Sequence, residues 1–227
     1  MTKTIEDLFL YLVAFSDFLI ILLFLVFIRK TKAEKGLWVI FSYCLLDLAV
    51  NYTLESAPRR LLLLIYTLFT LFEYLLFATF LWLNIKSERF KKGILAATAA
   101  FTLFLGFYYT TTTEFRSVDS LPIGVETILI LIYTFYYLYE QMNEPGELFI
   151  YNKYPFWISS GVMLYLAGSF FIYIFANQVD KKVLAQYWTF TYVFLIIKNI
   201  LFAIAILIHV KQKKNPSPEK HLYPYLN

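Results

Sequence analysis

Residues 186–210 read QYWTFTYVFLIIKNILFAIAILIHV, an apolar stretch in which Lys198 is the only Asp, Glu, Lys or Arg residue. At a rise of about 1.5 Å per residue, a helix over this stretch can cross the roughly 30 Å of hydrocarbon in a lipid bilayer. A helix that is apolar on every side is buried in a large protein or in a membrane. The stretch therefore predicts a transmembrane helix with one lysine near its middle.

Six further stretches are apolar over similar lengths, and the composition is that of a membrane protein. Of the 227 residues, 60% are hydrophobic and 16% are charged, whereas soluble domains carry about 25% charged residues. We expect an all-α, polytopic membrane protein with one seven-helix domain over 1–210 and a tail over 211–227. The predicted helices cover residues 7–28, 37–54, 61–85, 93–109, 122–142, 156–176 and 186–210.

The Lys and Arg residues between these helices are distributed unevenly. Most lie in the tail and in the connections on the side of the C-terminus. Basic residues favour cytoplasmic connections, so we expect the N-terminus outside and the C-terminus in the cytoplasm. Because Glu6 and Asp7 precede a first apolar run that is too long for a secretory signal, no cleavable signal is expected. The compact loops and the Phe-, Ile- and Lys-rich composition suggest a bacterial inner membrane.

Four ionisable residues lie near the middle of predicted helices: Asp17, Asp47, Glu73 and Lys198. Charge at the bilayer centre costs several kcal/mol unless it is paired or neutralised, so such residues usually mark a functional interior. Three carboxylates and one lysine cannot all be ionised in a dry core. Either some are protonated, or the interior is wet, or a cation binds there.

Asp47 shares a helix face with Tyr43 and Asn51, one turn to either side. This trio either coordinates a small cation or satisfies its own hydrogen bonds. For Lys198, the plainest interpretation is a structural ion pair with Glu73. The functional alternatives are a site for an anion or carboxylate ligand, a proton-linked switch, and a Schiff-base lysine. We expect one cavity with ionisable groups, lined by Asp17, Tyr43, Asp47, Asn51, Glu73 and Lys198.

A second group of charges lies towards the predicted outside. Glu126 is one turn into the helix over 122–142, and Arg59 and Arg60 lie at the mouth of the helix over 61–85. We expect these three residues to form an outer vestibule. The plainer alternative for Glu126 is an interfacial carboxylate that water reaches.

Helices 1–3 and 5–7 look like diverged copies, although apolar segments also match by chance. The copies would cover 7–85 and 122–210, in the same orientation, with the helix over 93–109 as a linker. This alignment would place Glu73 opposite Lys198 across a central cavity. The matching stretches are 73–86 with 198–211, 42–49 with 160–167, and 17–24 with 126–133.

This plan resembles the transporter–opsin–receptor group of seven-helix membrane proteins. The segments 119–127 (DSLPIGVET) and 165–175 (YLAGSFFIYIF) are also similar to small seven-helix bacterial membrane proteins, some of which are the membrane halves of sensor kinases. Opsin-like pigments carry a lysine in helix 7 and a carboxylate in helix 3, which are the predicted helices of Lys198 and Glu73. Microbial pigments carry an Asp one turn before the lysine, where this chain has Phe194, and an Arg close to the helix 3 carboxylate, whereas Arg59 and Arg60 are more than ten residues from Glu73. These departures disfavour retinal, and no cofactor is expected.

Several classes of function lack the residues that they need. With Cys44 as the single cysteine and His209 and His221 as the two histidines, no disulfide within the chain and no ordinary His/Cys zinc site can form. No Ser–His or Cys–His pair is available within the membrane, so we do not expect an enzyme. Nothing supports a nucleic-acid role.

Three functions remain. The first is a sensor or receptor-like signalling module, in which a ligand or proton shifts the Glu73/Lys198 pairing and a cytoplasmic or membrane partner such as a kinase reads the change. The second is a transporter of a small solute or ion that uses the same cavity. The third is a structural membrane subunit whose buried charges specify packing.

Overall fold

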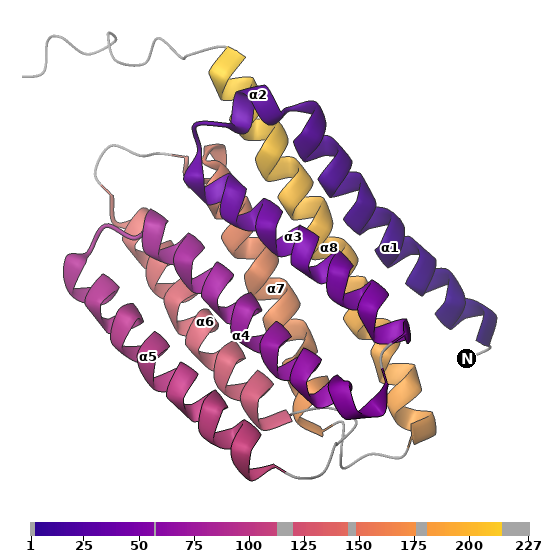
Figure 1. The fold of residues 1–227 in the computed structure, drawn as a ribbon. Coiled ribbons are helices and arrows are strands. Elements are labelled where there is room, and N and C mark those ends of the chain that lie inside the picture. Colours follow the sequence, from indigo (N-terminus) through magenta and orange to yellow (C-terminus); the bar gives the residue numbers. More distant parts are fainter. Residues whose placement is uncertain (1–2, 57, 113–119, 145–148, 176–180, 215–227) are drawn as a thin grey trace, which may run out of the picture.

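The computed structural model describes residues 3–56, 58–112, 120–144, 149–175 and 181–214, and this part of the chain is helical, without strands. Two short elements, α2 (Ile28–Thr31) and the 3-10 turn η1 (Ile150–Asn152), lie between long helices. The long helices are α1 (Lys3–Val26), α3 (Lys35–Ser56), α4 (Arg59–Asn84), α5 (Glu88–Thr111), α6 (Ser120–Met142), α7 (Tyr154–Phe175) and α8 (Lys181–Lys214) (Figure 1).

All seven long helices are long and apolar enough to cross a membrane, as the sequence predicts. Each also presents a large apolar side chain on the outside of the bundle, which is the surface that lipid tails cover. The protein is therefore a multi-pass integral membrane protein. Exposed examples, from α1 to α8, are Phe15, Tyr52, Phe72, Leu103, Phe135, Phe171 and Phe190.

The helices α5 and α8 extend furthest beyond their predicted bounds, because a helix need not end where the membrane does. The helix α5 begins at Glu88, where the Ser87 side chain accepts a hydrogen bond from the backbone N–H of Phe90 at 3.4 Å. Such a cap satisfies one of the free N–H groups at a helix start. The helix α8 continues through Lys211 to Lys214.

Six helices form a closed ring in the order α1, α3, α4, α6, α7, α8, and α8 returns to α1. The helix α5 lies outside this ring, packed on α4 and α6 (Figure 1). The start of α1 and the end of α8 lie at opposite ends of the bundle. We call the end where α8 finishes the basic face, because Lys30, Lys86, Lys91, Lys153 and Lys213 lie there, and the other end the opposite face.

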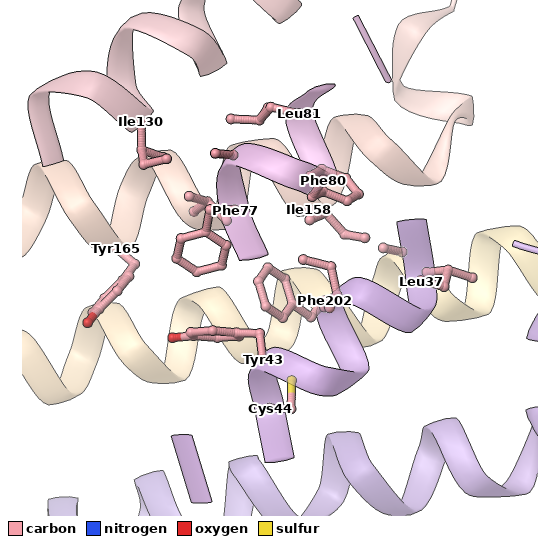
Figure 2. Close-up of a cluster of buried hydrophobic side chains, with 14 of the residues drawn as sticks. Leu37, Tyr43, Cys44, Phe77, Phe80, Leu81, Ile130, Ile158, Tyr165 and Phe202 are labelled. Carbon is pink, nitrogen blue, oxygen red and sulfur yellow. The ribbon is translucent and has the colours of Figure 1, made fainter. Parts of the chain in front are cut away.

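The interior near the basic face is filled by large apolar side chains. Tyr43 borders this filling, with its ring centroid 4.5 Å from that of Phe77 and 6.4 Å from that of Phe202. We call this cluster the apolar plug (Figure 2). It consists of Leu37, Phe77, Phe80, Leu81, Ile158 and Phe202, all buried.

The carboxylate of Glu140 holds the connection between α4 and α5 at the basic face. It accepts hydrogen bonds from the backbone N–H groups of Lys86 at 2.7 Å and Ser87 at 2.9 Å. Nearby, Glu144 pairs with Lys86 and with Lys153. The hydrogen bond from Lys86, together with the charges of Lys153 and Lys86, lowers the pKa of Glu144 below its usual value.

The helices α7 and α8 approach closely because α7 carries glycines where α8 presents bulk. A Cβ atom at Gly168 would lie 2.5 Å from the ring of Phe194, closer than any ordinary contact. One heptad earlier, a Cβ at Gly161 would lie 3.3 Å from the backbone oxygen of Lys198. Small residues allow this approach in membranes, where packing drives helix association.

Gly168→Ala should therefore lower the stability of the protein by about 1–3 kcal/mol, the usual cost of overpacking. Gly106→Ala is the matched control, because nothing lies within 4 Å of an added Cβ there and alanine favours helix. Thermal unfolding of the detergent-purified variants, followed by circular dichroism, measures both. Equal midpoints for the two variants would contradict the close contact.

Candidate functional site

Lys198 is fully buried in α8, with none of its surface exposed, and its amino group is held by α3. The Nζ atom donates a hydrogen bond to the Tyr43 hydroxyl at 2.7 Å. It also forms an ion pair with Asp47, with 3.4 Å between Nζ and Oδ2. Tyr43 and Asp47 are four residues apart on one face of α3, as the sequence predicts, and that face meets Lys198.

Aromatic rings surround the same ammonium group. Its Nζ atom lies 4.6 Å from the ring centroid of Tyr43, 4.9 Å from that of Tyr165 and 6.0 Å from that of Phe202. Faces of aromatic rings attract cations, more strongly where water is excluded. Figure 2 shows these three side chains and the hydroxyls of Tyr43 and Tyr165 directed towards the same side. Protein groups thus take the place of water around the charge.

Glu73 reaches Lys198 through Tyr43. The Tyr43 hydroxyl, which accepts from Lys198, donates to Oε1 of Glu73 at 3.2 Å. The predicted structural ion pair between Glu73 and Lys198 is wrong in its partner, because the ion pair of Lys198 is with Asp47. The reason is that the face of α3 that carries Tyr43 and Asp47 is directed into the interior of the ring, where both side chains contact Lys198. We call Lys198, Tyr43, Asp47 and Glu73 the Lys198 network.

Two further predicted residues flank this network. Asn51 donates to Oδ1 of Asp47 at 3.3 Å, so Asp47 joins Asn51 to Lys198, whereas Tyr43 joins Lys198 to Glu73. Asp17 accepts instead from Asn199, with 2.6 Å between Nδ2 and Oδ1. Asn199 is not among the predicted site residues, although its position next to Lys198 in an apolar stretch was a usable signal.

Glu126 is buried within the described part of the bundle. Its side chain in the second turn of α6 is 1% exposed, which contradicts a carboxylate reached directly by water. Its Oε1 atom has no hydrogen-bond partner among the described residues, and Glu73 is the charged group that acts on it. The side chains of Arg59 and Arg60 lie outside the described residues, so the vestibule that they would complete stays a prediction.

The charges in the described interior do not balance. Four carboxyl groups are buried there, those of Asp17, Asp47, Glu73 and Glu126, against the one amino group of Lys198. Burying unpaired charge is costly, so the excess must be met by protons or by a cation. Within the described residues, no group of three or more His, Cys, Asp or Glu side chains has the arrangement of a metal site.

No protein-family model matches the chain, and comparison with curated proteins and with solved structures returned no match. The class of the protein therefore follows from its own fold. It is a multi-pass, all-helical membrane protein with a buried ionisable network in the middle of its ring.

Tyr43→Phe should lower stability by about 1–3 kcal/mol, because it keeps the ring but leaves Glu73 and one N–H of Lys198 without a partner. Tyr52→Phe, on the exposed side of the same helix, should change stability by less than about 0.5 kcal/mol. Unfolding by sodium dodecyl sulfate in mixed micelles gives both values. If Tyr43→Phe and Tyr52→Phe give indistinguishable unfolding curves, the Tyr43 hydroxyl does not stabilise the protein.

Proposed function

We propose that the protein is a membrane-embedded sensor module in which the Lys198 network is the switch and the end of α8 is the output. The N-terminus lies outside, the C-terminus lies in the cytoplasm of a bacterial cell, and the partner is a kinase or other regulator. The concentration of Lys and Arg residues on the C-terminal side supports this orientation.

The observation that carries the proposal is the continuity of α8. Lys198 lies near its middle, and the same unbroken helix runs to Lys214 at the basic face. There, Lys213 donates to the backbone oxygen of Lys30 at 2.7 Å, and Gln212 donates to that of Asn152. A change in the partners of Lys198 therefore acts on α8, whose far end contacts the connection between α1 and α3 and the connection between α6 and α7.

The ring order supports the predicted repeat. If 7–85 and 122–210 are copies joined by the helix over 93–109, then α4 and α8 are equivalent and stand across the ring, with α5 outside it as a linker would be. Glu73 and Lys198 then come from matching helices. A carboxylate and an amine joined through one tyrosine hydroxyl make a switch with two charge arrangements.

The ring also suits the second candidate, a transporter of a small solute or ion around the same network. The apolar plug and the unbroken α8 favour sensing, because transport sites are typically built where helices are interrupted. A purely structural subunit is the third candidate, and it predicts no response at the far end of α8.

The test places a spin label at Lys211→Cys in a Cys44→Ser background, since Cys44 is the only cysteine. Lys198→Met should change the mobility of this label in nanodiscs, although the two sites are about 20 Å apart along the helix. Leu207→Met is the control, because Leu207 lies on the exposed side of the same helix.

An unchanged spectrum in Lys198→Met, with the protein folded, would contradict the sensor proposal. Reconstituted vesicles loaded with a pH-sensitive dye test the transporter. We expect proton flux equal to that of protein-free vesicles, whereas flux that Lys198→Met abolishes would establish transport.

A further inference from the structure

Most of the buried side-chain oxygens that lack a hydrogen-bond partner among the described residues lie in the half of the bundle near the opposite face, and the exception is Ser159. Near the basic face, the ring is closed by the apolar plug, which reaches Tyr43. Beyond the Lys198 network, towards the opposite face, several buried side-chain oxygens have no hydrogen-bond partner among the described residues. They belong to Thr67, Glu126, Thr127, Thr189 and Thr191. Such groups cost free energy unless something else meets them.

Glu126 is the ionisable member of this set. Two titratable groups on the helices packed on α6 interact with it electrostatically, Glu73 of α4 and Tyr173 of α7. The third neighbour, α5, carries its charged residues only between 88 and 92, at the basic face. No cation among the described residues therefore balances a charged Glu126 carboxylate.

We propose that Glu126 is a proton-binding site, reached from the opposite face, whose occupancy controls the charge beside Glu73. A proton from water adds to a carboxylate oxygen of Glu126 and makes a neutral carboxylic acid. When the proton leaves, a negative charge develops on Glu126 of α6 and disfavours a second one on Glu73 of α4. The repulsion destabilises a charged Glu73, which accepts the hydrogen bond of Tyr43. Tyr43 in turn accepts a hydrogen bond from Lys198, so the effect reaches the lysine.

A proton fits this site better than a metal ion. A divalent cation needs six or more oxygen ligands, or at least several carboxylates in one place, and no such cluster is found in the described part of the chain. A single unpartnered oxygen is sufficient for a proton. The proposal deepens the sensor function by naming its stimulus, and its effect on Lys198 rests on that function, whereas proton binding at Glu126 does not.

The experiment is infrared difference spectroscopy of the protein in nanodiscs, between acidic and neutral buffer. A protonated carboxyl group has a C=O stretching band that shifts in heavy water, and a carboxyl without hydrogen bonds absorbs at its high-frequency side. We expect this high-frequency component in the wild type, its loss in Glu126→Gln and a displaced component in Glu126→Asp. Glu140→Gln, on the same helix but at the basic face, should retain it.

A component that survives in Glu126→Gln would overturn the proposal. So would a component that depends on exchanging sodium for choline, because the site would then hold a cation. The Lys211→Cys label separates the two proposals. If Glu126→Gln abolishes the infrared component while Lys198→Met leaves the label unchanged, the proton site stands and the sensor fails. If the component survives but Lys198→Met moves the label, the sensor stands and the proton site fails.

Discussion

The whole interior is organised around one ammonium group that has no access to water. Lys198 is fully buried, and a lysine in that position must be paired or lost as a charge. Asp47 and the Tyr43 hydroxyl supply the pairing, and three aromatic rings supply the remaining surroundings. These contacts link α3 to α8 through the interior of the ring, and the glycines of α7 let that helix pack closely on α8 at the same level.

The polarity of the interior then differs on the two sides of that point. Large apolar side chains fill the ring towards the basic face, although Ser159, Trp82 and His209 there also have unpartnered polar atoms, whereas the Glu126 carboxyl and four unpartnered hydroxyls lie towards the opposite face. A transporter must expose its site alternately to both sides, and a sensor needs access from one side only. This uneven distribution favours the proposed sensor, in which the stimulus acts at the opposite face and α8 carries the response.

The amino-acid sequence by itself determined the seven helices and the identity of the buried charged residues. The reason is that spanning a bilayer is a local requirement: about 20 apolar residues suffice, whatever the rest of the chain does. The spacing of four residues likewise places Tyr43, Asp47 and Asn51 on one helix face. Asn199 could also have been found in this way.

Partner choice was decided only by the tertiary structure. Spacing along the chain indicates that Glu73 and Lys198 share a depth in the membrane, but the inward-directed face of α3 decides that Asp47 takes the ion pair and that Tyr43 bridges to Glu73. The burial of Glu126 was likewise not readable from its place near a helix start, because burial depends on which neighbours cover it. Helices form from local sequence, whereas pairings depend on the order in which the helices pack.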